Sequence, residues 1–154
     1  MTAPLELRHP RGDELASARQ IAEDVMGQVY RHLLGGRSLV PPALEPWADS
    51  WIALLDGDPV GVGMSHEDLV SDLWLLPRAR GHHIGSRLLD RLEGEVRERG
   101  YPRARLRVVA DNESARAFYR ARGWREAARF DHEKLGFQML NMYKDLDCNE
   151  GDQR

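Results

Sequence analysis

The stretch RGHHIGSRLL, from Arg80 to Leu89, lies between two segments with different hydrophobic patterns. The segment before it, LVSDLWLLP (69–77), is typical of a strand that ends at a proline. After it, apolar residues recur at every third or fourth position until Gly100, which predicts a helix. Glycines at such a corner let the backbone approach a ligand, and the first N–H groups of a helix attract anions. Taken alone, the stretch is either a phosphate-binding loop or a structural corner.

Outward from this corner, the hydrophobic patterns predict one α/β domain with a mixed sheet. The expected elements, in chain order, are a strand at 5–8, a helix that follows Asp13 and stops at Gly35, a hairpin at 51–65, a strand at 69–77, a helix from about His83, a strand at 104–109, a short helix after Asn112, and strands at 125–131 and 137–144. This order predicts a single domain over 1–146. The polar segment 147–154 is expected to be a disordered tail.

Composition excludes several classes of protein. The chain has 154 residues, of which 42% are hydrophobic and 31% charged, as in ordinary globular proteins. Its net charge of -3 argues against a nucleic acid or an anionic membrane as partner. The single cysteine, Cys148, excludes an internal disulfide, and no segment has the pattern of a signal peptide or a membrane span. We therefore expect a cytoplasmic protein.

A second stretch, DNESARAFYRARGW at 111–124, has the pattern of a short capped helix. Asn112 is a suitable N-cap residue, and Gly123 is placed to end the helix. Ala115 and Tyr119 lie four residues apart and share one helix face. The two stretches together, in this order and at this separation, resemble the GNAT superfamily of acyl-CoA N-acyltransferases.

The resemblance rests on two signatures. The phosphate loop of the family has the pattern (Q/R)-x-x-G-x-(G/A), which Arg80 and Gly85 match at its ends. The second signature, N-x-x-A-x-x-x-Y-x-x-x-G-(F/W), is matched at every position, by Asn112, Ala115, Tyr119, Gly123 and Trp124. The departure is His83, which stands where the loop of the family usually has glycine.

The resemblance implies both a fold and a reaction. The fold is the single-domain GNAT fold, α/β, with a mixed, mostly antiparallel, twisted sheet of about seven strands flanked by helices. The reaction is the direct attack of an amine on the thioester of acetyl-CoA. By the same resemblance, the protein is an acetyl-CoA-dependent N-acetyltransferase.

The resemblance also implies where acetyl-CoA binds. The pantetheine arm lies beside the strand that ends at Leu76, and backbone N–H groups of residues 74–76 polarise the thioester carbonyl. N–H groups from His82 to Ser86 bind the pyrophosphate, and Asn112 contacts the pantetheine arm or the acceptor. The implied cofactor-binding residues are Leu75, Leu76, Arg80, Gly81, His82, His83, Ile84, Gly85, Ser86, Asn112 and Tyr119.

Two residues are candidates for acid–base catalysis. Tyr119 is the implied general acid, because a phenol with an ordinary pKa of about 10 is protonated at pH 7. An amine with a pKa of about 10.4 needs a base at pH 7. Of the nearby carboxylates Glu67, Asp68 and Asp72, we select Asp72, because it lies inside the strand beside the expected active centre. Tyr119 as a half-buried aromatic, and Asp72 as a carboxylate bound by backbone or arginine, stay open as alternatives.

The acceptor is not identified by the sequence. Small amines, amino acids, antibiotics, protein N-termini and lysine side chains are all compatible with it. The resemblance places the acceptor near 29–47 and 130–137, where Tyr30, Trp47 and His132 are candidate lining residues.

Three further possibilities concern a non-catalytic role, a metal site and a homodimer. The chain can be a non-catalytic acyl-CoA-binding or regulatory module with the same fold, which His83 favours. A metal site at His82 and His83 is disfavoured, because adjacent residues at a helix start diverge by about 100°. A homodimer is compatible with the family.

Overall fold

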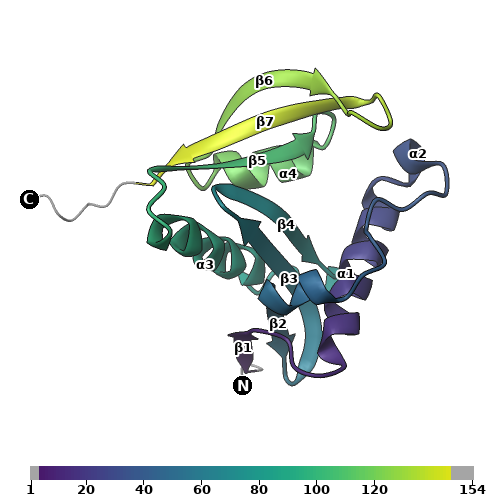
Figure 1. Ribbon diagram of the computed structural model, residues 1–154, viewed down its shortest axis with the longest axis vertical. Helices are drawn as coiled ribbons and strands as arrows, with labels where there is room; N and C mark the ends of the chain where they lie inside the picture. The colour runs from purple at the N-terminus through teal and green to yellow at the C-terminus, as the bar shows by residue number, and fades with distance from the viewer. Residues whose placement is uncertain (1–3, 147–154) are drawn as a thin grey trace, which may run out of the picture. The chain divides into compact units, whose positions relative to one another are not determined.

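The computed structural model describes residues 4–146, which contain a seven-stranded sheet with the order β1-β2-β3-β4-β5-β7-β6 (Figure 1). The strands are β1 (Leu5–Arg8), β2 (Trp51–Leu55), β3 (Asp58–His66), β4 (Leu69–Leu75), β5 (Arg103–Val109), β6 (Arg125–Asp131) and β7 (Gln138–Asp145). The helices are α1 (Glu14–Val29), α2 (Arg31–Leu34), α3 (Ile84–Glu98) and α4 (Glu113–Arg120), with short 3-10 helices η1 (Glu45–Asp49) and η2 (Pro77–Ala79).

The predicted mixed, mostly antiparallel α/β sheet is confirmed. β4 and β5 pair in parallel, whereas β1 with β2, β2 with β3, β5 with β7 and β6 with β7 pair antiparallel. No helix within residues 4–146 has the length and hydrophobicity needed to cross a membrane. The predicted tail at 147–154 lies outside the described residues.

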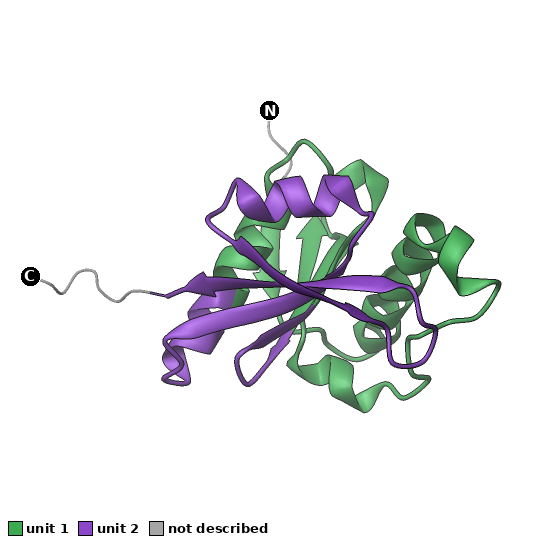
Figure 2. Ribbon diagram, turned by 90° about the horizontal axis from the view of Figure 1, so that it is seen from above, with its two compact units in different colours: residues 1–64, 72–92 green, residues 65–71, 93–154 purple. Residues whose placement is uncertain are grey.

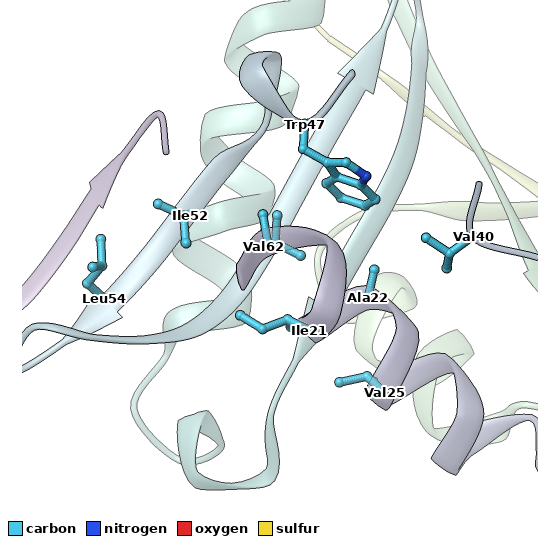
Figure 3. Packing of buried hydrophobic residues seen from close by; sticks show 9 residues of the cluster. Ile21, Ala22, Val25, Val40, Trp47, Ile52, Leu54 and Val62 are labelled. Atoms are coloured by element: carbon cyan, nitrogen blue, oxygen red, sulfur yellow. The ribbon is translucent and has the colours of Figure 1, made fainter. Parts of the chain in front are cut away.

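The chain forms two compact units, which we describe separately (Figure 2). Unit 1 comprises residues 1–64 and 72–92. On one face of β2 and β3, it buries a cluster under α1 (Figure 3), made of Ala18, Ile21, Ala22, Val25, Val40, Trp47, Ile52, Leu54 and Val62. A second cluster joins β2 and β3 to the start of α3 and is made of Ala53, Val60, Ala79, Ile84 and Leu88. Side chains that alternate along β2 thus fill both clusters, as expected for a strand covered on both faces.

The structure confirms the predicted hairpin and divides the first predicted helix. The hairpin of β2 and β3 turns at Asp56 and Gly57, whose positive φ values of 54° and 83° suit the Asp-Gly type I′ turn. The helix predicted from 13 to 34 is divided at Tyr30, which separates α1 from α2. The Tyr30 ring meets Trp74 edge-on, with ring centroids 6.3 Å apart. Apolar spacing continues through this break, so periodicity alone could not predict it.

Unit 2 comprises residues 65–71 and 93–154 and contains the antiparallel strands β5, β7 and β6. Along β5, the buried Ala104, Leu106 and Val108 alternate with exposed arginines, as the sequence predicts. α4 begins after Asn112, whose side-chain oxygen accepts a hydrogen bond from the Ala115 N–H at 3.1 Å. The predicted N-cap is therefore confirmed.

Glu14, the first residue of α1, is expected to stabilise unit 1 in a pH-dependent way. Its carboxylate accepts two hydrogen bonds from the Arg8 guanidinium, at 2.6 and 3.0 Å, and one from the Arg11 N–H at 2.9 Å. The Arg8 hydrogen bond is the main cause that lowers the pKa of Glu14 from 4.5 to about 2. A carboxyl with a depressed pKa in the folded state contributes stability above its unfolded pKa and loses it as the pH falls through the folded value.

Glu14→Gln is therefore expected to lower the free energy of unfolding by about 1 kcal/mol at pH 7. The loss should shrink as the pH falls from 4.5 towards 2, the window set by the two pKa values. Urea denaturation of both proteins across this range measures the difference. An equal loss at both ends of the range would contradict the expectation.

Candidate functional site

The predicted site residues of β4 lie on two faces of the sheet in unit 1. Trp74 and Leu76 pack against the cluster under α1, and Asp72 shares their face by strand alternation. Leu75 packs on the opposite face, against the cluster at the start of α3. The half-buried Asp72 accepts a hydrogen bond on Oδ1 from the Trp74 indole N–H at 2.9 Å. The structure therefore places Asp72 on the α1 face, which alternation alone left undecided.

Backbone N–H groups at the end of β4 point in alternating directions. The Leu76 N–H donates to the Val60 carbonyl at 2.8 Å, so β3 already engages it. Successive N–H groups of a strand point to opposite edges, and the Leu75 N–H therefore points away from β3. Of the two residues, Leu75 is the better placed to donate a hydrogen bond to a thioester oxygen.

The loop after η2 leads directly into α3, which begins at Ile84. Gly81 and His83 both have positive φ, at 83° and 60°. The space beside Gly81 is open, because a Cβ there would meet no atom within 4 Å. The His83 carbonyl accepts hydrogen bonds from the Ser86 hydroxyl at 3.1 Å and the Arg87 N–H at 3.2 Å. His83 is therefore the residue at which the loop becomes a helix.

The N-terminus of α3 has the chemistry to bind a phosphate group. The first N–H groups of a helix, here those of residues 84–86, lack acceptors within the helix and lie at its positive end. The side chains of Arg80, His82 and Arg87 are exposed on or beside this loop. Backbone N–H groups and cationic side chains are the donors that bind phosphates in proteins. The donor set present thus fits the diphosphate of coenzyme A.

His83 carries a side chain in a backbone conformation that favours glycine. A left-handed backbone costs an L-residue about 1 kcal/mol or more. His83→Gly is therefore expected to raise the free energy of unfolding by up to about 1 kcal/mol, with acetyl-CoA affinity kept within about twofold. His83→Val is expected to lower the free energy of unfolding by about 1 kcal/mol, because β-branched residues tolerate this region worst. Urea denaturation measures the free energies of unfolding of the wild type and the two variants. A valine variant as stable as the glycine variant would contradict a left-handed backbone at position 83.

Asn112 and Tyr119 belong to unit 2, whereas Asp72 and the other predicted acetyl-CoA-binding residues, from Leu75 to Ser86, belong to unit 1. Tyr119 is half-buried on α4. Its ring meets Phe118 and Trp124 edge-on, with centroids 5.2 and 5.9 Å away. The side-chain oxygen of Asn112 accepts the hydrogen bond that caps α4.

Ion pairs join α4 to β6, and a hydrogen bond joins it to Ala110, the residue after β5. The Arg116 guanidinium donates to both carboxylate oxygens of Glu126, at 2.8 and 3.0 Å, and to the Ala110 carbonyl at 2.8 Å. Arg120 donates a further hydrogen bond to Glu126 at 2.7 Å. The hydrogen bond from Arg116 is the main cause that lowers the pKa of Glu126 from 4.5 to about 2. Glu126 is therefore ionised at neutral pH, and α4 is fixed at the side that faces β6.

The three candidate acceptor residues have different surroundings. Trp47 is only 4% exposed and belongs to the cluster under α1 (Figure 3). The Nδ1 atom of His132 accepts hydrogen bonds from the N–H groups of Lys134 and Leu135, at 3.1 and 3.2 Å. Trp47 is thus a core residue, whereas acceptor binding by Tyr30 or His132 stays a prediction.

Sequence reasoning missed Glu93 of α3. This residue is 5% exposed, and its carboxylate accepts hydrogen bonds from the Trp124 indole N–H at 2.9 Å and from Lys144 Nζ at 2.8 Å. A signal for it was present, because Glu93 lies four residues after Leu89 and three before Val96, in the buried stripe of α3. A carboxylate in such a stripe requires hydrogen-bond partners.

Most of the chain matches a known protein family. Residues 17–124, more than half of the chain, match the model of the acetyltransferase (GNAT) family. The matched segment includes Asp72, the loop before α3, Asn112 and Tyr119.

Solved structures share the fold at low sequence identity. A GCN5-related N-acetyltransferase from Rhodopseudomonas palustris is 21% identical, with a TM-score of 0.72, over 95% of this chain and 98% of that chain. The ribosomal-protein-alanine N-acetyltransferase from Brucella melitensis is 23% identical, with a TM-score of 0.73, over 92% and 99% of the two chains. The PaiA N-acetyltransferase from Thermoplasma acidophilum, solved in complex with coenzyme A, is 19% identical, with a TM-score of 0.66, over 93% and 99%.

Proposed function

The chain belongs to the acetyltransferase (GNAT) family, and we propose that it transfers an acetyl group from acetyl-CoA to a primary amine by direct attack on the thioester. The observation that carries the proposal is the loop before α3. Gly81 and His83 give this loop its positive-φ backbone, and it ends at a helix N-terminus beside exposed cationic side chains. Arg80 and the first N–H groups of α3, which are suitable donors to a diphosphate, lie in or next to the stretch 80–85 that matches the phosphate-loop pattern.

Acetyl-CoA supplies the acetyl group as a thioester, and the residues of this chain bind and polarise it. N–H groups of residues 84–86, together with Arg80, would bind the diphosphate. The Leu75 N–H points to the edge of β4 away from β3, where it would donate to the carbonyl oxygen as negative charge develops there. Tyr119 would donate its phenolic proton to the departing thiolate.

The attacking amine must lose a proton. An amine with a pKa of about 10.4 costs about 4–5 kcal/mol to deprotonate at pH 7, at about 1.36 kcal/mol per unit. A carboxylate that accepts this proton directly or through water would reduce the cost. We propose Asp72 as this base. The Trp74 indole N–H donates to Oδ1 of its carboxylate and so holds the orientation of the group, while Oδ2 is the oxygen that would accept the proton.

The function is tested by amine-dependent release of CoA thiol. The protein is mixed with acetyl-CoA and a panel of small amines, amino acids and peptides with free N-termini or lysines, and acetylated products are identified by mass spectrometry. The proposal expects at least one amine to raise thiol release above the rate without amine. Tight acetyl-CoA binding with no turnover on any amine would instead favour a non-catalytic acyl-CoA-binding module.

Asp72→Asn tests the base separately. With an accepted amine, this variant is expected to lower kcat/KM about 100-fold or more at pH 7, because only the small deprotonated fraction of the amine can then react. The deficit should disappear as the pH rises towards the pKa of the amine, near about 10. A deficit of equal size at all pH values would contradict a role as base and would favour a structural role in holding Trp74.

A further inference from the structure

We infer that Glu93 is a positioning residue for Tyr119 and acts through Trp124; this inference rests on the proposed role of Tyr119 as general acid. Glu93 is a buried ionisable side chain that the proposed mechanism does not use. Both of its carboxylate oxygens are engaged within unit 2. Oε2 accepts from the Trp124 indole N–H at 2.9 Å, and Oε1 accepts from Lys144 Nζ at 2.8 Å.

Trp124 links Glu93 to Tyr119 through its ring and its backbone. Its ring lies 5.9 Å from the Tyr119 ring between centroids, at an interplanar angle of 62°. Its backbone N–H donates to the Tyr119 carbonyl at 3.1 Å. Because Trp124 is only 2% exposed, the direction of its indole N–H depends on the acceptor that Glu93 provides. The orientation of the Trp124 ring in turn limits the orientation of the Tyr119 ring.

Lys144 lies beside the turn that follows Tyr119. Gly123 forms this turn with a φ of 92°, and a Cβ added there would lie 3.5 Å from Lys144 Cε. The Arg122 N–H donates to the Tyr119 carbonyl at 2.9 Å, so the end of α4 and the turn share one acceptor. Glu93 therefore holds the ring of Trp124, and its partner Lys144 lies next to the turn that joins Trp124 to Tyr119.

Stability alone is a poor explanation for this pair, in which the side chain of Glu93 is 6% exposed and that of Lys144 is 26% exposed. The desolvation of two charges cancels much of their attraction, and apolar replacements of buried ion pairs are often as stable. The neighbours of Glu93 in the stripe, Leu92 and Val96, are fully buried apolar residues, so an apolar side chain suits this position. A carboxylate supplies what an apolar side chain cannot, namely a directional acceptor for the indole N–H. The orientation of Trp124, and through it Tyr119, is the property that Glu93 adds.

The first test is a double-mutant cycle with an accepted amine. Glu93→Gln keeps the size of the side chain but turns an amide NH2 towards either Lys144 or Trp124, so both partners cannot be satisfied. We expect kcat to fall about 10-fold, with KM for acetyl-CoA within about twofold. In the Tyr119→Phe protein the same change is expected to cause no further fall, because the phenol is already absent. Equal falls in both backgrounds would show a general structural role and overturn the inference.

Glu98→Gln is the matched control, since Glu98 is an exposed carboxylate on the same helix. It is expected to leave kcat unchanged, and a fall equal to that of Glu93→Gln would overturn the inference.

Trp124→Phe provides an independent variant, because it keeps an aromatic ring and removes only the N–H donor and the larger ring. Circular dichroism checks that each variant is folded. If Glu93→Gln is unfolded, the cycle is repeated with Trp124→Phe, and the same two outcomes decide.

A second readout does not depend on turnover. With 3-fluorotyrosine at position 119, fluorine NMR reports the surroundings of this ring. Glu93→Gln is expected to shift or broaden the resonance and Glu98→Gln to leave it unchanged. An unchanged resonance in Glu93→Gln would overturn the inference. A changed resonance in a protein that acetylates no amine would support the coupling of Glu93 to Tyr119 and would contradict only the proposed function.

Discussion

Tyr119→Phe is expected to lower kcat about 1,000-fold with an accepted amine. The substitution removes one hydroxyl group, while the ring keeps its edge-on contacts with Phe118 and Trp124. Binding of acetyl-CoA is expected to change by less than about twofold, because the phenolic proton is needed only as the thiolate departs. Steady-state kinetics and calorimetric titration of acetyl-CoA measure the two quantities separately.

Tyr143→Phe is the matched control for this experiment. Tyr143 is a half-buried tyrosine of β7, whose ring lies 4.4 Å from the Arg103 guanidinium. Phenylalanine retains this contact, so kcat should stay at the wild-type value. If Tyr119→Phe also kept most of kcat, Tyr119 would be the half-buried aromatic that the sequence left as the alternative, and the acid would have to be sought elsewhere.

Gly85→Val is expected to weaken acetyl-CoA binding about 100-fold or more. Gly85 is the second residue of α3 and is buried. A phosphate oxygen must lie about 2.7–3.2 Å from a backbone nitrogen to accept its hydrogen bond. Branched methyl groups at this position would hold the diphosphate beyond that distance from the helix N-terminus. Calorimetric titration with acetyl-CoA measures the loss.

The control for Gly85→Val is Gly94→Val on the same helix. A Cβ at Gly94 would meet no atom within 4 Å, so the side chain has room. This variant should bind acetyl-CoA like the wild type, and replacing glycine within a helix should not destabilise it. A wild-type affinity in Gly85→Val would contradict a diphosphate that lies against this backbone.

Local patterns were enough to predict most of the fold. Strand alternation and turn residues located strands such as β2, β3 and β5, because buried and exposed residues alternate along β5 and the hairpin turn of β2 and β3 needs a left-handed backbone at Gly57. The break at Tyr30 could not be predicted from periodicity, because the apolar spacing continues through it; in the structure the Tyr30 ring meets Trp74, which is distant in the sequence. That 1–146 form one domain stays a prediction, as does the identity of the acceptor.

The candidate site was predictable where it follows the chain and not where it depends on packing. The signatures identified the loop at Arg80 and the helix of Tyr119, because each is one short, local motif. Alternation shows that Asp72 and Leu75 lie on opposite faces of β4, but it does not show which element packs on each face. Glu93 was missed because its partners are distant in the sequence: Trp124 precedes β6, and Lys144 lies in β7. The positive φ of His83 shows why glycine is usual at this position of the loop.

The most direct test of the account compares the affinities of the wild-type protein for acetyl-CoA and for S-acetylpantetheine by calorimetry. S-Acetylpantetheine carries the same thioester but lacks the diphosphate and the nucleotide. We predict one acetyl-CoA site with a dissociation constant in the micromolar range, and binding of S-acetylpantetheine weaker by about 100-fold or more. No acetyl-CoA binding up to about 1 mM, or equal affinity for the two compounds, would contradict the claim that the N-terminus of α3 binds the diphosphate.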